Sequence, residues 1–174
     1  MPAIPLDFYR TEDPIAIARQ LLGALLITEI EGIRTVGRIV ETEAYRGWGD
    51  AACHAHAGTR SPRTEVMYGN GGTAYVYLCY GIHNLFNIVT NGPQRADAVL
   101  IRALEPLNGL SHMLARRGLQ KPEKRVTMGP GSLSKAMGIT RDLYGMELVP
   151  GTVWLEWGDE VPDGRVKIGP RVGV

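Results

Sequence analysis

The sequence predicts a single α+β domain, in which a curved, mainly antiparallel sheet built of hairpins carries short flanking helices. Strand-like segments are separated by turns rich in Gly and Asn, such as Glu31-Gly32 and 69–72, and short turns of this kind favour antiparallel pairing. The helix-like segments are short and are bounded by Pro and Gly. No repeat, low-complexity tract or linker divides residues 1–174, so one domain accounts for the chain.

Periodicity sets the expected elements. Runs with alternating apolar residues, rich in β-branched and aromatic side chains, predict strands at residues 24–30, 34–45, 73–79, 85–90, 98–104 and 152–157. Asp13 followed by Pro14 marks a helix start, because Asp caps free N–H groups and Pro fits the first turn. Further helices are expected at 107–117, with Leu107 on the apolar face, and at 132–137.

The composition is that of an ordinary globular protein, with 44% hydrophobic and 21% charged residues. No apolar run approaches the roughly 20 residues that cross a bilayer. The N-terminus lacks the basic start and apolar middle of a signal peptide. The two cysteines, Cys53 and Cys79, form no motif with each other, which fits reduced thiols. We therefore expect a cytoplasmic, monomeric protein that makes no membrane contact.

The net charge of +1 does not by itself indicate a nucleic-acid ligand, but the charge is unevenly distributed. Residues 51–145 hold 11 Lys/Arg and five Asp/Glu, whereas the two flanks together hold eight and 13. Most of these cations are Arg, whose planar guanidinium suits phosphate oxygens. The pattern predicts one cationic side on a polar molecule, and ordinary scatter of surface charge is the alternative.

The most informative segment is Val40-Glu41-Thr42-Glu43-Ala44-Tyr45. Acidic residues are depleted in strands, yet strand alternation places Glu41, Glu43 and Tyr45 on one face. Two carboxylates beside a phenol predict a reaction centre. The alternative explanation is a solvated edge strand, where charged side chains discourage unwanted pairing.

A second cluster lies in residues 73–81, which contain three tyrosines. Tyr75 and Tyr77 share a strand face, and their rings would form a platform on which a nucleobase stacks with roughly 1–3 kcal/mol. Tyr80 precedes Gly81 at a turn and is expected at a hairpin tip, from which an aromatic ring can enter a DNA base stack. The alternative is that these tyrosines simply favour strands and pack on their neighbours.

Cys53, His54 and His56 raise the question of a metal site, because thiolate and imidazole groups bind zinc. Structural zinc sites usually combine two separated ligand pairs, C-x₂-C and H-x₃₋₅-H, and neither pair is present. We therefore expect no metal and no other cofactor, and we expect His54 to donate a hydrogen bond to the substrate. A loop histidine without such a role is the alternative.

A series of motifs runs along the chain in a fixed order. They are 37–45 (GRIVETEAY), His54, Ser61-Pro62-Arg63, Tyr75-Val76-Tyr77, Tyr80-Gly81, Asn87, 100–106 (LIRALEP), Gly129-Pro130 with Leu133, and Arg171-Val172-Gly173-Val174. In this order and spacing they resemble the alkyladenine (3-methyladenine) DNA glycosylase family. The resemblance covers nearly the whole chain from Asp7 onward, and its long motifs are specific to the family.

The resemblance implies a reaction centre on Glu43 and Arg102. Glu43 matches the family's general base, which activates the water that attacks C1′ of an extruded nucleotide. General-base help of this kind is worth roughly 10²–10⁴-fold in rate. Arg102 matches an arginine that lies near that water and carboxylate.

The resemblance also implies how a purine is held. Tyr45 and Tyr77 match aromatic rings that sandwich the flipped base, and His54 matches a donor to the base edge or to the adjacent backbone. Asn87 matches the residue that excludes normal guanine, whose exocyclic amino group would clash with it. Tyr80 matches the side chain that fills the gap left in the duplex.

The implied activity is base-excision repair of double-stranded DNA that contains alkylated or deaminated purines, of the 3-methyladenine, 7-methylguanine and hypoxanthine type. This activity places the protein at the bacterial nucleoid. We expect a monofunctional, metal-independent enzyme, because strand nicking needs an amine for a Schiff base. The lysines all lie outside the Glu and Tyr motifs, at Lys121, Lys124, Lys135 and Lys167.

Two positions depart from the family pattern. Ser132 precedes Leu133 where the family usually places Lys, so one expected phosphate contact is missing. Family members usually continue past the position of Val174 with a segment that completes the sheet, so we expect this sequence to be either a naturally short form or a trimmed one.

Three other functions are compatible with the residues. The first is a nucleic-acid-binding module of the same fold with weak turnover. The second is a metal-dependent hydrolase built on Cys53, His54 and His56. The third is an RNA-binding accessory to a larger assembly, against which the Glu43–Arg102 pair argues.

Overall fold

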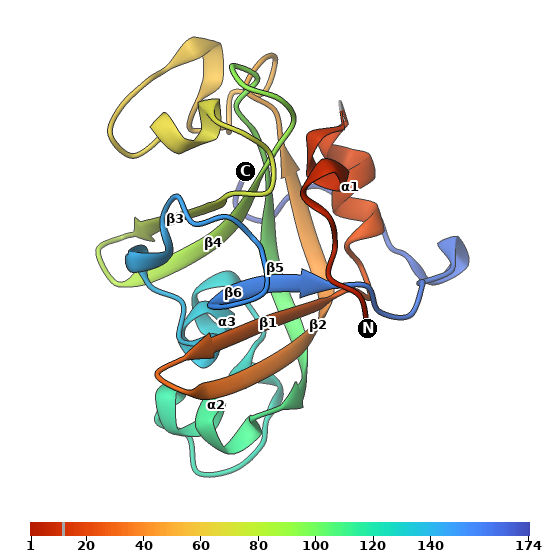
Figure 1. Cartoon of the computed structure of the whole chain (residues 1–174), viewed down its shortest axis with the longest axis vertical. Coiled ribbons are helices and arrows are strands. Elements are labelled where there is room, and N and C mark those ends of the chain that lie inside the picture. Colours follow the sequence, from red (N-terminus) through yellow and green to blue (C-terminus); the bar gives the residue numbers. More distant parts are fainter. Residues whose placement is uncertain (12) are drawn as a thin grey trace.

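The computed structural model describes residues 1–11 and 13–174, which form one curved antiparallel sheet flanked by helices (Figure 1). The strand order is β3-β4-β5-β2-β1-β6. The strands are β1 Leu25–Ile30, β2 Ile33–Tyr45, β3 Ala74–Cys79, β4 His83–Thr90, β5 Asp97–Asn108 and β6 Val153–Glu156, and the α-helices described are α1 Pro14–Gln20, α2 Leu110–Arg117 and α3 Pro130–Met137. None of these helices has the length and apolar character of a membrane span. The expected α+β class is confirmed.

Strand β2 lies inside the sheet, between β1 and β5. A bulge in it decides which side chains face the candidate site. Its register with β5 shifts between Ile39 and Thr42, and an extra residue there bends the strand. Ile39 enters the core at 1% exposure, whereas Val40 is 51% exposed. Beyond the bulge, Thr42 Oγ1 donates to a carbonyl of α1 at 2.9 Å. Alternation then turns Glu43 and Tyr45 away from α1.

Two apolar clusters cover opposite faces of the sheet. The larger cluster packs strands against helices and includes Ile17, Ile39, Val76, Phe86, Ile88, Ile101, Met113 and Leu133. The smaller cluster lies beneath the loop between β2 and β3 and consists of Cys53, Ala55, Met67, Tyr68, Tyr75, Val89, Ala96 and Ala98. Because β3 and β4 give alternate residues to each cluster, both of their faces are covered.

The helix expected from residue 107 begins too early and is corrected by the structure. Strand β5 continues to Asn108, and Leu107 is 45% exposed instead of lying on a helical face. Pro106 lies opposite Gly37 beside a second register shift, a position that tolerates Pro because the ladder is already interrupted. Gly109, with a φ of 76°, ends the strand, and α2 follows at the next residue. Pairing with the long strand β2 therefore extends β5 past the point where local sequence favours a helix.

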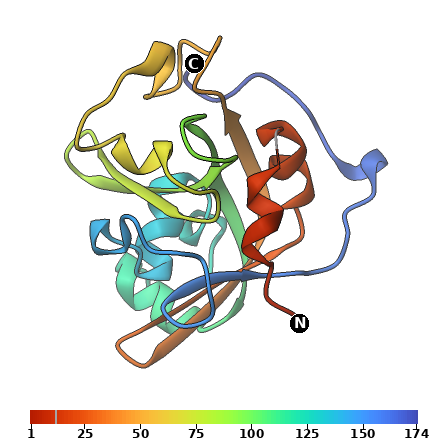
Figure 2. The ribbon, with the colours of Figure 1, turned by 45° about the horizontal axis from the view of Figure 1, so that its top comes forward.

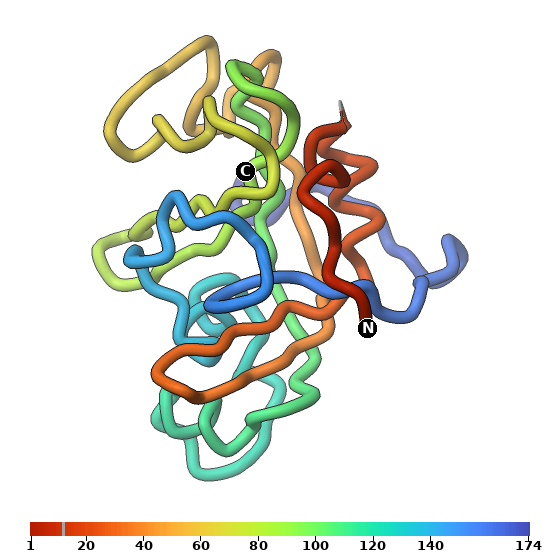
Figure 3. Tube along the Cα trace, in the orientation of Figure 1, coloured from red at the N-terminus to blue at the C-terminus, as the bar shows by residue number. Residues whose placement is uncertain are grey.

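The stretch after β6 runs back along α1 and returns to the far end of β2 (Figures 2 and 3). Arg19 of α1 holds it midway, because Nη2 donates to the Val161 carbonyl and to Asp163 Oδ1, each at 2.6 Å. Farther along, Arg171 binds Asp50, just beyond the end of β2. The last residues of the chain therefore lie beside the segment that contains Glu43.

Candidate active site

The strand pairing brings candidate site residues into one row across the sheet. Glu43 of β2 pairs with Leu100 of β5, Leu100 pairs with Asn87 of β4, and Asn87 pairs with Tyr75 of β3. Residues directly opposite one another on neighbouring strands point to the same face. Glu43, Asn87 and Tyr75 are therefore on one face, although they come from three different strands.

The Glu43 carboxylate is buried, with 7% of the residue exposed, and three donors surround it. The Tyr45 hydroxyl donates to Oε2 at 2.7 Å, which confirms that these two residues share a face. The backbone N–H of Val172 donates to Oε1 at 2.8 Å, and Arg102 Nη1 lies 3.3 Å from the same oxygen. These contacts offset the desolvation that burial imposes on a carboxylate.

Arg102 joins the two acids of β2. Its Nε donates to Glu41 Oε1 at 3.1 Å while its Nη1 faces Glu43. The Glu41 side chain is 46% exposed, whereas those of Glu43 and Arg102 are 6% and 12% exposed. Glu43 is therefore the buried acid of the two, and Glu41 is a solvated partner of the arginine.

The tyrosines near Glu43 differ in exposure, although the Tyr75 and Tyr77 rings lie side by side with centroids 5.4 Å apart. Tyr75 is only 2% exposed and belongs to the smaller core cluster, so the expected Tyr75–Tyr77 platform is wrong for Tyr75. Tyr45 and Tyr77 are half-buried at the edge of that cluster. Burial raises the pKa of Tyr77 to about 12, and burial together with the Glu43 hydrogen bond raises the pKa of Tyr45. Both phenols are therefore protonated at neutral pH.

Tyr75 orients His54 from inside the cluster. His54 Nδ1 lies 2.9 Å from the Tyr75 hydroxyl, and the imidazole stands edge-on to the Tyr77 ring at 4.6 Å and 80°. Burial, and next the charge of Arg63, lower the pKa of His54, so the ring is neutral at neutral pH. Because Nδ1 is occupied, Nε2 is the nitrogen left for a further partner.

Cys53, His54 and His56 do not converge. Cys53 Sγ lies 3.8 Å from the Ala96 carbonyl, and burial raises the pKa of its thiol to about 11. Across residues 1–11 and 13–174, no three His, Cys, Asp or Glu side chains are arranged to hold a metal ion. The alternative zinc site on these three residues therefore has no geometric support.

Asn87 is fixed within the sheet, with 4% of the residue exposed. Its Nδ2 donates to the carbonyls of Tyr75 at 3.2 Å and of Leu85 at 3.4 Å. These bonds set the orientation of the amide plane. Asn87 therefore presents a rigid polar group on the face that carries Glu43.

Tyr80 stands at the tip of the β3–β4 hairpin, as expected (Figure 1). The residue is 94% exposed, and Ile82 beside it is 73% exposed. Its backbone φ of 50° lies in the left-handed region that residues other than Gly rarely adopt. The tip therefore presents two apolar side chains to solvent.

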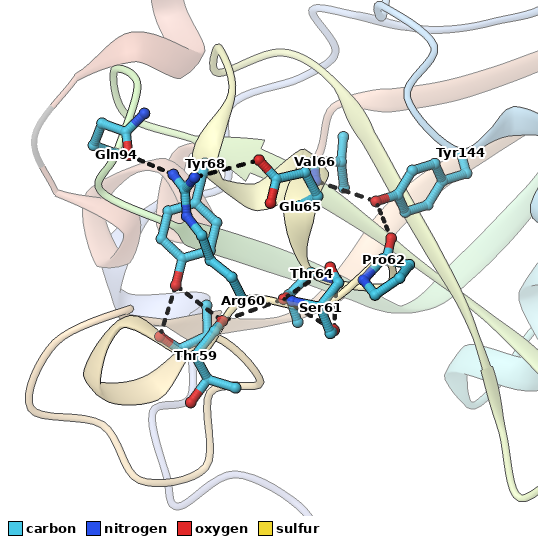
Figure 4. A network of polar contacts seen from close by, with 11 residues as sticks. Thr59, Arg60, Ser61, Pro62, Thr64, Glu65, Val66, Tyr68, Gln94 and Tyr144 are labelled. Atoms are coloured by element: carbon cyan, nitrogen blue, oxygen red, sulfur yellow. Dashed lines mark hydrogen bonds and ion pairs between the residues drawn. The ribbon is translucent and has the colours of Figure 1, made fainter.

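The loop that carries His54 is braced by a polar network (Figure 4). The Tyr144 hydroxyl donates to the Pro62 carbonyl at 2.9 Å and accepts from the Val66 N–H at 3.1 Å. The Tyr68 hydroxyl donates to another loop carbonyl at 2.9 Å, and the Arg60 guanidinium lies 4.1 Å over the Tyr68 ring. These contacts tie residues 59–68 of the loop to one another and to Tyr144, in the segment between α3 and β6.

Two groups beside Glu43 are not predicted by sequence reasoning. Arg171 Nη1 and Nη2 donate to Asp50 at 2.6 and 2.8 Å, and the guanidinium lies 4.5 Å from the centre of the Tyr45 ring. Val172 supplies the N–H bound to Glu43. Asp50 and Arg171 are 121 positions apart, so no local pattern pairs them. The only signal is the closing Arg171-Val172-Gly173-Val174 motif.

A cavity of about 360 Å³ lies between α1 and the stretch after β6. Arg19, Trp157 and Glu160 are among its lining residues, and no candidate site residue lines it. The candidate site is therefore the sheet face around Glu43, not this cavity.

Known proteins are similar to this sequence over nearly its full length. The family model described as methylpurine-DNA glycosylase matches residues 7–174. A relative from Myxococcus xanthus, whose name assigns it to the 3-methyladenine DNA glycosylases, is 48% identical over 171 residues, which is 98% of this chain and 81% of the relative. Similarly named relatives from Encephalitozoon cuniculi and Bacillus licheniformis are 46% and 44% identical, over 91% and 98% of this chain and 76% and 85% of their own. The chain belongs to the methylpurine-DNA glycosylase family.

Proposed function

We propose that this chain is a monofunctional DNA glycosylase that removes alkylated or deaminated purines from double-stranded DNA in base-excision repair. Family membership supplies the reaction class, hydrolysis of an N-glycosidic bond, and the names of the relatives support 3-methyladenine as a substrate. The observation that carries the proposal is the buried Glu43 carboxylate, bonded to Tyr45 on the sheet face that also carries Tyr77.

A purine stacked inside a duplex is out of reach of a buried carboxylate, so the nucleotide has to be rotated out. Extrusion costs a few kcal/mol of stacking and pairing, and it costs least for a damaged base. Tyr80 would occupy the gap, because its ring is exposed at a hairpin tip and apolar wedges at such tips insert between base steps. Ile82, exposed beside it, would add apolar contact.

Glu43 would act as the general base. It takes a proton from a water whose oxygen bonds to C1′, while the C1′–N bond breaks and its electron pair leaves with the purine. A cationic N-alkylated purine leaves as a neutral base without further protonation. Arg102 would hold the Glu43 carboxylate, and the developing oxocarbenium charge at the sugar favours a nearby anion.

Tyr45 and Tyr77 would hold the extruded purine between their rings. Electron-rich faces attract a cationic purine, which gives alkylated bases an advantage over normal ones. His54 would donate from Nε2 to the base edge or to the adjacent backbone, since Nδ1 faces Tyr75. Asn87 would select against normal guanine, because an amide fixed by two carbonyls cannot move aside for the exocyclic amino group. 7-Methylguanine carries the same amino group, but its positive charge favours stacking on the tyrosines and makes it a better leaving group, which would offset this contact.

The proposal predicts alkali-labile sites at single lesions. Duplexes that carry one 7-methylguanine or hypoxanthine should break at the lesion after incubation with the protein and alkali, and should stay intact without alkali. Sodium borohydride should trap no protein–DNA adduct, because water rather than a lysine attacks the sugar. The matched undamaged duplex is the control.

Three outcomes would contradict this function. Tight binding to lesion duplexes without alkali-labile sites would favour the alternative of a binding module with weak turnover. An efficient borohydride adduct would show that an amine is the nucleophile. Loss of excision on treatment with a chelator would support the metal-dependent alternative instead.

A further inference from the structure

The Arg171 guanidinium is held at the end of β2 by three hydrogen bonds. It makes a two-pronged contact with Asp50, at 2.6 and 2.8 Å, and Nη1 also donates to the Ala44 carbonyl at 3.0 Å. The two side chains are 26% and 14% exposed. Paired N–H donors facing two carboxylate oxygens fix direction as well as distance.

Asp50 is itself prepared for this contact. Its carboxylate accepts hydrogen bonds from the backbone N–H of Arg46 and of Ala52, each at 3.1 Å, so it is held in place independently of Arg171. The Arg171 hydrogen bond is the main reason that the pKa of Asp50 lies below its usual value. The pair therefore stays ionised through neutral pH.

The anchored residues contact three successive positions of β2. The Val172 N–H donates to Glu43 Oε1, the Arg171 guanidinium binds the Ala44 carbonyl, and the same guanidinium covers one face of the Tyr45 ring. A purine that stacks on Tyr45 would therefore have to use the opposite face of the ring. Because Asp50 neutralises Arg171, the cation behind the ring does not repel a cationic base in front of it.

We propose that Asp50 and Arg171 are positioning residues for base excision, which act by holding the Val172 N–H against Glu43 and the Tyr45 ring in place. This inference rests on the proposed role of Glu43 as general base. Without the anchor, Oε1 loses one of its two donors and the carboxylate can rotate toward Arg102. A displacement of the Glu43 carboxylate by about 1 Å is enough to lower the excision rate about 10²-fold.

Single-turnover excision separates positioning from binding. Arg171→Ala and Asp50→Asn should each lower the excision rate about 10- to 100-fold. Affinity for a duplex with an abasic-site analogue should change by less than about threefold. Arg171→Lys, which keeps a cation but loses the fork, should restore part of the rate. The double variant Asp50→Asn/Arg171→Ala should be no worse than the poorer single variant, because both act through one contact.

Val172→Pro tests the backbone contact directly, since proline has no N–H to donate to Glu43. Val172→Pro should lower the excision rate as much as Arg171→Ala does. Val172→Ala, which keeps the N–H, should excise at the wild-type rate. Arg19→Met is the matched control, because Arg19 holds the same stretch at Val161 and Asp163, upstream of the residues that contact Glu43 to Tyr45. The rate of this control should stay at the wild-type level.

The inference is overturned if Arg171→Ala and Val172→Pro excise at the wild-type rate, or if Arg19→Met loses as much as they do. The proposed function fails in a different way. If Glu43→Gln keeps the wild-type rate, the general-base role itself is refuted, whatever the anchor variants do.

Discussion

At the scale of single residues, Tyr45 has two tasks in the site. Its hydroxyl donates to Glu43 at 2.7 Å, and under the proposed function its ring would offer one face to a purine while Arg171 covers the other. A buried carboxylate without donors costs several kcal/mol, so the hydroxyl also stabilises the folded state. In the proposed mechanism one side chain would both hold the general base and contact the substrate, so stacking of a purine would be coupled to the position of the carboxylate.

Asp50 gives a pH-dependent prediction at the same scale. Its folded-state pKa is lowered, chiefly by the Arg171 hydrogen bond, so its contribution to stability is present above about pH 4 and is lost as the pH falls through the folded-state value. The melting temperature of wild type should therefore exceed that of Asp50→Asn most near neutral pH, and the gap should shrink as the pH is lowered below about 4. Thermal unfolding across this range checks the prediction, and a gap independent of pH would contradict it.

At the scale of elements, the bulge in β2 and the length of β5 set the geometry of the site. The bulge sends Ile39 into the core and shifts the alternation so that Glu43 and Tyr45 face away from α1. Strand β5 carries Leu100 and Arg102 alongside and then continues to Asn108. The turn at Gly109 is consequently packed between β5, β2 and α2.

Two glycines test this arrangement, because both have positive φ but different surroundings. A Cβ on Gly109 (φ 76°) would lie 2.7 Å from the Arg34 carbonyl oxygen, whereas one on Gly118 (φ 67°) would meet nothing within 4 Å. Gly109→Ala should therefore lower the free energy of unfolding by about 2–4 kcal/mol, from backbone strain plus the clash. Gly118→Ala should cost about 1 kcal/mol, from strain alone. Equal losses in denaturant titrations would contradict the close approach at Gly109.

Local sequence predicts most elements, because alternation, turn residues and helix caps are local signals. It misplaces the start of α2 because the extension of β5 depends on pairing with β2, distant in the chain. For the site, the motifs select Glu43, Tyr45 and Tyr77, and the structure brings the first two into contact. They cannot show that Tyr75 is covered, since the covering cluster comes from a separate loop.

At the scale of the whole molecule, segments far apart in sequence meet on one sheet face: β2, the His54 loop, the β3–β5 strands and the C-terminal stretch. Residues 51–145, which carry the excess of Lys and Arg, supply His54, Tyr77 and the hairpin tip. Phosphate attraction and base contacts would therefore come from the same part of the chain.

The most direct test of the account compares Glu43→Gln with Glu41→Gln in single-turnover excision and in binding to the same lesion duplex. Both acids lie on β2 and contact Arg102, but only Glu43 is buried and bonded to Tyr45. Glu43→Gln should lose at least about 10²-fold in excision rate, while its affinity for the duplex changes by less than about threefold. Glu41→Gln should keep most of the wild-type rate. Wild-type excision by Glu43→Gln would contradict the claim that this carboxylate activates the attacking water.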